Sequence, residues 1–325
     1  MEWEIADGSK QPIAAPMTSA KPLPPCYRKL DSGQWQAKLD FFSENFSPCC
    51  LCPRQCRSER LQGRPGVCHN VDRVRIASHS LHFGEEPPVS GRRGSGTIFF
   101  SGCTLKCLFC QNWPISQLAN GKFCSVTQLA EMFLYLQKNG AHNINWVSPT
   151  PHLHHAVQAL FLASQKGLAI PVVYNTSGYE RVEVIRQLDG LVDIYMPDLK
   201  YHDDDLACRL SGVRDYVANA MASIAEMFAQ TGELKIDQDG VAQRGTIIRH
   251  LIIPGEVRNS LAVLQAISQS SFKKSFLSLM SQYFPAHRAV DDPALCRRLS
   301  PEEYRQVRDY ALELGFEDGW FQDIG

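Results

Sequence analysis

Three cysteines in one short segment are the residues of this sequence best suited to chemistry. Cys103, Cys107 and Cys110, the cysteine triplet, follow the spacing C-x3-C-x2-C within CTLKCLFCQN. A structural zinc site closes with four ligands, and an iron–sulfur cube takes four thiolates, one for each iron. Three thiolates therefore either recruit a fourth ligand, such as a histidine on zinc, or leave one metal position open, as catalytic metal sites do.

A second group of cysteines precedes the triplet. Cys49, Cys52, Cys56 and Cys68 have the spacing C-x2-C-x3-C-x11-C, and the adjacent Cys50 could replace Cys49. Four thiolates can complete a four-iron cluster or a zinc tetrahedron, so we predict a second [4Fe–4S] cluster or zinc here, with metal-free thiols as the remaining alternative. A closed site of this kind would fold the loop or relay electrons and would not perform catalysis.

The composition restricts the class of protein. The chain has 325 residues, 44% of them hydrophobic and 21% charged, with a formal net charge of -1. This balance is typical of a globular protein and gives no overall field that would attract nucleic acid or a membrane. We find no run of about 18 apolar residues and no apolar signal-peptide core, so we expect a cytoplasmic protein without membrane spans. In that reducing compartment, clustered cysteines are typical of metal ligands.

The elements that must position the triplet alternate regularly. Six short apolar runs are each followed by a segment with helical periodicity, which predicts a parallel sheet with crossover helices. The six runs are residues 97–102, 144–148, 170–178, 191–200, 245–255 and 276–283. Such a chain could close into a partial barrel or form a doubly wound open sheet, and in both designs the chemistry lies at the carboxyl ends of the strands.

Polar residues stand at those strand ends and predict a single polar site. We expect the following side chains to bind a cofactor there: Asn145, Ser148, Thr150, Asn175, Ser177, Asp198, Lys200 and His250. Asp198 and Lys200 are two residues apart on a strand, so both point to the same face. Because burial of unpaired charge is costly, we expect them to pair with each other or with a ligand. Arg249 and His250 point to opposite faces, so only one of them can face the site, and we assign His250 to it.

The triplet, in a loop after the first strand of a βα series, resembles the radical S-adenosylmethionine (SAM) superfamily. In that family three thiolates hold a [4Fe–4S] cluster whose open iron chelates the amino and carboxylate groups of SAM. One electron from the cluster cleaves the sulfonium, and the resulting 5'-deoxyadenosyl radical abstracts a hydrogen atom from the substrate. The resemblance implies an α/β fold, a partial (βα)6 barrel of radical SAM type with an N-terminal cysteine-rich loop module, and [4Fe–4S] and SAM as cofactors.

Longer segments resemble the activating enzymes of glycyl-radical enzymes. GSGTIFFSGCTLKCLFCQN is similar to their cluster loop, VDIYMPDLKY to a strand with an Asp-x-Lys pair near the cofactor, and IIRHLIIPG to the strand after it. Residues 48–325 resemble the group labelled pyruvate formate-lyase activating enzyme homologues. This implies an unidentified protein substrate, such as a glycyl-radical enzyme, and an electron donor of the flavodoxin or ferredoxin type.

The chain departs from that pattern in two places. Activating enzymes usually carry Gly-Gly-Glu after the second strand, in contact with the cofactor's amino group, whereas this chain has VSPTPH there. Asn145, Ser148 or Thr150 could accept that hydrogen bond instead. The additional cysteines also precede the triplet, whereas activating enzymes with extra clusters carry them after it. Glu85 and Glu86, in HFGEEPP, could line the space between the two cysteine groups.

The sequence predicts four parts. These are a flexible N-terminal tail with a short helix (1–47), a cysteine-rich metal-binding module (48–96), the radical SAM partial barrel (97–285) and a C-terminal helical extension (286–325). An alternative function is radical SAM modification of RNA or a small molecule, with the arginine-rich loop at 54–64 as a docking surface rather than a solvated loop. A non-enzymatic alternative is a cysteine-rich electron-transfer or zinc-stabilised scaffold.

Overall fold

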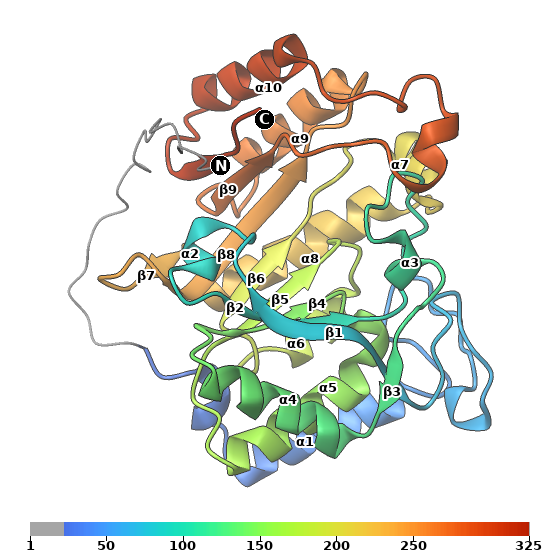
Figure 1. Cartoon of the computed structure of the whole chain (residues 1–325), viewed down its shortest axis with the longest axis vertical. Coiled ribbons are helices and arrows are strands. Elements are labelled where there is room, and N and C mark those ends of the chain that lie inside the picture. The colour runs from blue at the N-terminus through green and yellow to red at the C-terminus, as the bar shows by residue number, and fades with distance from the viewer. Residues whose placement is uncertain (1–22, 325) are drawn as a thin grey trace, which may run out of the picture.

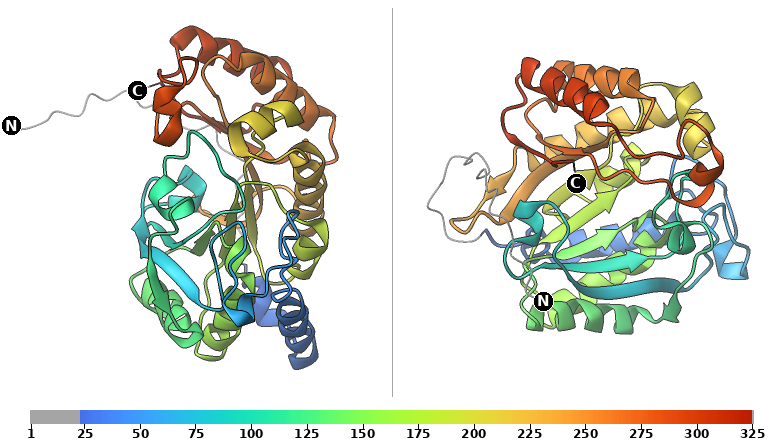
Figure 2. Two further views of the ribbon diagram at one scale, coloured as in Figure 1. Left: turned by 90° about the vertical axis from the view of Figure 1, so that its right-hand side faces the viewer. Right: turned by 45° about the horizontal axis from the view of Figure 1, so that its top comes forward.

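The chain folds into a curved sheet with helices packed around its outer face (Figures 1 and 2). The computed structural model describes residues 23–324, so the tail predicted for residues 1–22 lies outside the described part. A 3-10 turn, η1 (Cys26–Lys29), and helix α1 (Ser32–Glu44) precede the sheet, and α1 is the short helix that the sequence predicts. No helix within residues 23–324 is long and apolar enough to cross a membrane.

All six predicted strands are present and parallel. They are β2 (Ser95–Phe100), β4 (Ile144–Val147), β5 (Val172–Thr176), β6 (Ile194–Pro197), β8 (Ala242–Leu251) and β9 (Phe276–Met280). Each one pairs with the next along the chain. A doubly wound sheet would reverse its strand order at a switch point. Since this order never reverses, the sheet is a partial barrel.

Helices connect the strands and cover the convex side (Figure 2). They are α4 (Val126–Lys138), α5 (Leu153–Gln165), α6 (Val182–Gln187), α7 (Asp204–Ser211), α8 (Tyr216–Thr231), α9 (Val257–Gln269) and α10 (Pro301–Glu313). Shorter helical segments are η2 (Arg60–Gln62), α2 (Pro87–Ser90), α3 (Trp113–Ser116), η3 (Thr150–His152) and η4 (His287–Asp291). Ser125 and Ser300 start α4 and α10 through capping boxes.

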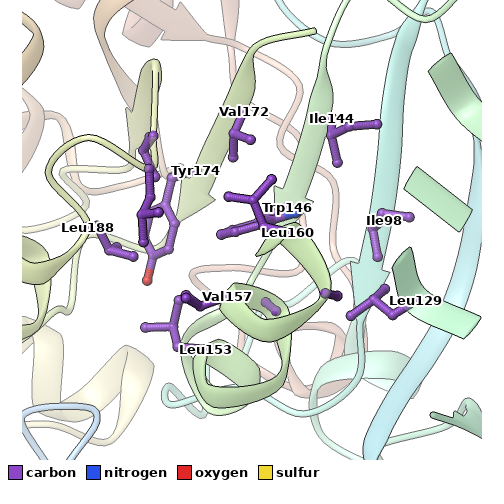
Figure 3. Close-up of a cluster of buried hydrophobic side chains, with 14 of the residues drawn as sticks. Ile98, Leu129, Ile144, Trp146, Leu153, Val157, Leu160, Val172, Tyr174 and Leu188 are labelled. Carbon is purple, nitrogen blue, oxygen red and sulfur yellow. The ribbon is translucent and has the colours of Figure 1, made fainter. Parts of the chain in front are cut away.

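Side chains alternate between the two faces of the sheet, and this alternation decides which residues can reach the site. Trp146 and Tyr174 are register partners on the helix-facing side, where they are buried in the cluster that also contains Leu129 and Leu160 (Figure 3). Asn145 and Asn175, one residue away from each, point to the inner face.

The side chains on the inner face of the sheet form an apolar layer and a polar layer, which follow each other along the barrel axis. Apolar side chains fill its lower layer: Val89, Val173, Ile194, Met196, Ala242 and Ile247. Asp198 on the β6 side forms a bridge with Arg249 on β8, nearer the carboxyl ends of the strands. The inner face therefore changes from apolar to polar toward the end where the sequence predicts the site.

The edges of the sheet carry strands outside the six-strand pattern. Strand β1 (Val74–His82) pairs antiparallel with β2, and β3 (Lys122–Cys124) pairs with β1. Because β1 lies in segment 48–96, the cysteine-rich part continues into the barrel sheet. A short β7 (Lys235–Ile236) pairs with β8. In the C-terminal part, where the sequence predicts only helix, β10 (Gly319–Phe321) adds a parallel strand to β9; three residues are too few for a periodic signal.

Candidate active site

A cavity of about 320 Å³ lies at the carboxyl ends of the parallel strands. Two thiols of the triplet, four charged side chains and several apolar side chains line it together. The lining includes Cys107, Cys110, Glu85, Asp198, Lys200, Arg249, Asn175, Phe99, Phe109, Leu251 and Met280. Thiol sulfur and buried charge thus share one space.

Three of the charged side chains form a buried ion network. Asp198, just after β6, accepts a hydrogen bond from Lys200 and another, at 2.8 Å, from Nε of Arg249 on β8. The three side chains are 12–15% exposed. Arg249 also donates to Oδ1 of Asn175 on β5 at 2.7 Å. Asp198 and Lys200 therefore pair with each other, which is one of the two pairings that their spacing left open.

The mutual contacts fix the charges of the network. Burial alone would raise the pKa of Asp198, but Arg249 and Lys200 outweigh burial and lower it. Burial alone would lower the pKa of Lys200, but Asp198 reverses that direction. At neutral pH the network holds two cations and one anion, and its excess positive charge suits a ligand that carries a carboxylate.

Glu85, in the loop between β1 and α2, brings a second carboxyl group to the cavity. Its Oε2 lies 3.7 Å from Nη1 of Arg249, and its Oε1 accepts a hydrogen bond from Nδ2 of Asn145 at 3.1 Å. Burial raises the pKa of Glu85 to about 7, with Arg249 opposing this shift and Glu86 adding to it. Glu85 therefore changes its protonation state near neutral pH.

The cysteine triplet lies in the loop that follows β2. Sγ of Cys107 is 2.9 Å from Oγ of Ser211, and Sγ of Cys110 is 3.1 Å from Oγ of Ser116. Burial raises the pKa of Cys107 to about 12 and that of Cys103 to about 11. Metal binding must therefore displace the protons of these thiols, and a metal would supply the charge that stabilises the thiolates.

The cluster loop is held firmly on both sides. The backbone N–H groups of Lys106 and Leu108 donate to carbonyl oxygens at the end of α7, at 3.0 and 2.8 Å. Gly102 has φ +85°, and a Cβ there would collide with the carbonyl oxygen of Cys68, so the turn into the triplet requires glycine.

The donor set fits a [4Fe–4S] cluster with one open iron. Within residues 23–324, no three His, Cys, Asp or Glu side chains are arranged to hold one metal ion. An iron–sulfur cube does not require its thiolates to converge on one ion, because each thiolate binds its own iron. Three thiols in one loop beside a polar cavity would provide three such ligands and would leave one iron without a ligand from the loop.

The structure divides the predicted cofactor-binding residues into two groups. Asn175, Asp198 and Lys200 line the cavity, and Asn145 reaches it through Glu85. The other four are not part of the lining: Ser148, Thr150, Ser177 and His250.

Each of these four has contacts elsewhere in the chain, which for Ser148 and Ser177 are made by main-chain atoms. The N–H of Ser148 donates to the carbonyl oxygen of Asn175 at 2.9 Å, and the carbonyl of Ser177 accepts a hydrogen bond from the hydroxyl of Tyr216 at 2.8 Å. Thr150 donates at 2.6 Å to the buried carboxyl group of Glu180.

The prediction that His250 faces the site is wrong. Its Nδ1 contacts the carbonyl oxygen of Leu199 at 2.7 Å, and its Nε2 contacts Oγ of Ser260 at 2.9 Å, on the side away from the cavity. Strand alternation places Arg249 on the inner face in its stead.

Comparison with known proteins identifies the family. The family model described as the radical SAM superfamily matches residues 97–265, just over half of the chain, and this range contains the triplet and the ion network. The chain belongs to the radical SAM superfamily. It is therefore an enzyme that uses SAM and a [4Fe–4S] cluster.

Relatives and solved structures of this radical SAM enzyme are distant. The chain is 30% identical over 282 residues to the uncharacterized protein MJ0674 of Methanocaldococcus jannaschii, covering 84% of this chain and 77% of that protein. It is 23% identical over 184 residues to MJ0808 of the same organism, covering 51% and 52%.

The chain also matches two solved structures at low identity. Streptococcus suis SuiB bound to precursor peptide SuiA matches at 12% identity with a TM-score of 0.45, covering 68% of this chain and 47% of SuiB, so the chain spans about half of SuiB. Spore photoproduct lyase matches at 9% identity with a TM-score of 0.43, covering 69% and 75%.

The second group of cysteines lies beside the cluster loop of this radical SAM enzyme. We refer to Cys49, Cys52, Cys56 and Cys68 as the N-terminal cysteine set. Cys49 lies near enough to Cys56, Cys68 and Arg60 for their charges to act on its thiol, and Cys52 lies similarly near Cys49 and Cys68. These neighbours favour Cys49 over Cys50 as the member of the set.

The arginine-rich loop is largely committed to internal contacts. Arg54 donates to the carbonyl oxygens of Thr104 and Gly212 at 2.6 and 2.9 Å, and Arg60 is 2% exposed. Of the four arginines in segment 54–64, only Arg57 and Arg64 are exposed. Too little of the loop's charge is free to form the basic docking surface that RNA would need.

Proposed function

We propose that this radical SAM enzyme holds its cluster on Cys103, Cys107 and Cys110 and binds SAM in the adjoining cavity to abstract hydrogen from a protein substrate. The observation that carries the proposal is that thiols of the triplet line the same cavity as a buried ion network with excess positive charge.

The charged residues suit the methionine end of SAM, which carries one carboxylate and one amino group. Lys200 and Arg249 can pair with the carboxylate, because the single anion Asp198 does not balance both of them. Glu85 can accept a hydrogen bond from the amino group. It would thereby take the role that the Gly-Gly-Glu segment has in the activating enzymes, from a different part of the chain.

The remaining lining keeps water from the reacting groups. Phe99, Phe109, Leu251 and Met280 supply apolar surface around the charged wall. When bound, the reduced cluster supplies the electron that cleaves SAM. The chain's own contribution is to orient SAM against the thiol loop and to exclude competing reactions.

A protein substrate is favoured over RNA or a small molecule for two reasons. The segments around the triplet and the Asp-x-Lys pair resemble activating enzymes, which act on glycyl-radical enzymes. The arginine loop that would dock RNA is mostly engaged in contacts within the chain. We further propose a flavodoxin- or ferredoxin-type electron donor and a cytoplasmic location, which suits the twelve free cysteines of the chain.

Deuterium transfer tests the proposed substrate class. The reconstituted enzyme, with SAM and dithionite, is incubated with extract from cells grown in heavy water, and 5'-deoxyadenosine is analysed by mass spectrometry. We expect 5'-deoxyadenosine to carry deuterium when the macromolecular fraction of the extract is the substrate. Treating that fraction with protease beforehand should abolish the label, whereas treating it with ribonuclease should not. Label that depends on RNA or on small molecules would contradict the proposal.

A further inference from the structure

A buried arginine in the cysteine-rich part has no anionic partner. Arg60 donates from Nη1 to the carbonyl oxygen of Pro151 at 2.5 Å and from Nη2 to Sγ of Cys68 at 3.2 Å, while its Nε has no partner. Its guanidinium lies 5.3 Å from the ring centroid of Phe46. No carboxylate within residues 23–324 forms an ion pair with it. An arginine cannot relieve this burial by losing its proton.

A second cation lies between the two cysteine groups. Nζ of Lys106, inside the triplet's loop, is buried without a hydrogen-bond partner in the described chain. It is near enough to Cys68 and Cys103 for both thiols to act on its charge. Because an uncompensated buried cation is costly, two of them near Cys68 indicate that anionic sulfur belongs there. Neutral thiols do not supply that charge, whereas metal-bound thiolates do.

We propose that the N-terminal cysteine set binds a second iron–sulfur cluster, that Arg60 and Lys106 are its counter-cations, and that it delivers electrons to the cluster on the triplet. An oxidised four-iron core with four thiolates carries a charge of about −2, which two cations balance. The inference rests on the proposed function, since the triplet's cluster is the electron acceptor.

The two cysteine groups are joined by direct contacts. Nδ2 of Asn70 donates to the carbonyl oxygen of Cys68 at 3.2 Å and to that of Ser101, just before the triplet, at 3.0 Å. From the other side of the loop, Arg54 donates to the carbonyl oxygen of Thr104, next to Cys103. A metal that only stapled the loop would not need to rest against the catalytic loop. A redox centre does need this proximity.

The proposed relay transfers one electron at a time, and no covalent bond forms or breaks in it. A flavodoxin- or ferredoxin-type protein gives one electron to the oxidised second cluster and is itself oxidised by one electron. The same electron then passes to the triplet's cluster, and the second cluster returns to its oxidised state.

Metal analysis tests the identity of the site. After anaerobic reconstitution, we expect about eight irons per chain in the wild type and about four in a Cys103→Ala/Cys107→Ala/Cys110→Ala variant, whose remaining cluster can be reduced and observed by electron paramagnetic resonance. Cys52→Ala in the otherwise wild-type chain should lose the four irons of the second cluster and keep the four on the triplet. Zinc bound to the N-terminal set, or no metal there, would overturn the proposal.

Redox titration tests the counter-cations in the same triple-alanine background. Arg60→Met and Lys106→Met each remove a positive charge, so reduction of the second cluster becomes harder. We expect at least a tenfold lower ratio of reduced to oxidised cluster at a fixed potential, which equals a shift of about 59 mV for one electron. The exposed Arg57→Met is the matched control. Unchanged potentials in both cation variants would overturn this assignment, and Lys106→Met keeps the test available if Arg60→Met does not fold.

Reductant choice tests the relay and separates it from the proposed function. For Cys52→Ala, formation of 5'-deoxyadenosine should be lost with flavodoxin or ferredoxin and persist with dithionite, a small reductant that can reach the catalytic cluster directly. Retained activity with the protein donor would overturn the relay. If the wild type makes no 5'-deoxyadenosine with either reductant, the proposed function itself has failed, while metal content and potential still decide whether the second cluster exists.

Discussion

The cavity and the N-terminal cysteine set differ in whether their buried cations have carboxylate partners. In the cavity, Lys200 and Arg249 both contact Asp198, and Glu85 faces Arg249. Beside the cysteine set, Arg60 is buried without any carboxylate partner in the described chain. In the first region each cation contacts a carboxylate of the chain, although the two cations outnumber the single anion Asp198. In the second region Arg60 contacts no carboxylate of the described chain.

This difference separates a site for an exchangeable ligand from a site for a permanent one. SAM must bind and leave during turnover, so its site must remain stable when empty. The mutual pairing of the cavity residues provides that stability and preorganises the charges. A cluster that stays bound can form part of the folded structure, so its counter-cations need no substitute partner.

Among the variants that test this difference, Asp198→Asn is expected to have the largest effect, a loss in the free energy of unfolding. It leaves Arg249 and Lys200 buried without their anion, and breaking a buried pair in this way costs about 3–5 kcal/mol. Urea denaturation should show that loss in the free energy of unfolding. Lys200→Met should destabilise less, because Asp198 keeps its contact with Arg249.

The same network should control SAM affinity. Loss of one charge-assisted hydrogen bond costs about 1.5–3 kcal/mol, so Lys200→Met should weaken SAM binding by about 10- to 150-fold. Equilibrium dialysis with the reconstituted protein measures this. The cavity would not be the SAM site if affinity stayed at the wild-type value.

A smaller effect on SAM affinity is expected when pH changes the protonation state of Glu85. Since burial raises its pKa to about 7, Glu85 is mostly neutral at pH 6 and mostly ionised at pH 8. If its carboxylate accepts from the amino group of SAM, affinity should fall by about eightfold between pH 7 and pH 5.8 as the ionised fraction decreases. Glu85→Gln should remove this slope.

Glu86→Gln is the matched control for the pH experiment. The carboxyl group of Glu86 accepts a hydrogen bond from Ser278 on β9 at 2.9 Å, and the residue is not part of the cavity lining, so this variant should keep a slope. That slope should lie at lower pH than in the wild type, because Glu86 no longer helps to raise the pKa of Glu85. A slope that survives in Glu85→Gln would assign the titration to another group.

The smallest effect on SAM binding is expected from His250→Asn. The histidine bridges Leu199 and Ser260 away from the cavity, so the change should lower the free energy of unfolding by about 1–3 kcal/mol through unsatisfied buried groups. SAM affinity should be unaffected, in contrast to Arg249→Met. Equal losses of affinity in the two variants would refute the assignment of opposite faces.

Local patterns in the sequence were sufficient for the main features of the fold. The six apolar runs predicted the parallel strands, because a strand buried on both faces leaves a continuous apolar signal. The two-residue spacing of Asp198 and Lys200 predicted that they share a face, because side chains of a strand repeat every second residue. It left open whether they pair with each other or with a ligand.

Features that depend on tertiary contacts were predicted only in part: the sequence indicated Glu85 as a candidate lining residue but not its contacts, and the wrong residue of β8 was assigned to the site. Glu85 reaches Asn145 from a loop about sixty positions earlier in the chain, and no local pattern records that contact. The choice of His250 over Arg249 failed because it required the register of β8. Counting in steps of two from Ile247, which lies in the apolar inner layer, leads to Arg249 and would have corrected it.

The central claim is that the triplet and the adjoining cavity together cleave SAM. The most direct measurement is 5'-deoxyadenosine formation by anaerobically reconstituted enzyme with SAM and dithionite, comparing wild type, Cys107→Ala and the exposed Cys296→Ala as a control. We predict product from the wild type and from Cys296→Ala, with none from Cys107→Ala and loss of its cluster absorption. Product formed by Cys107→Ala at the wild-type rate would contradict the account.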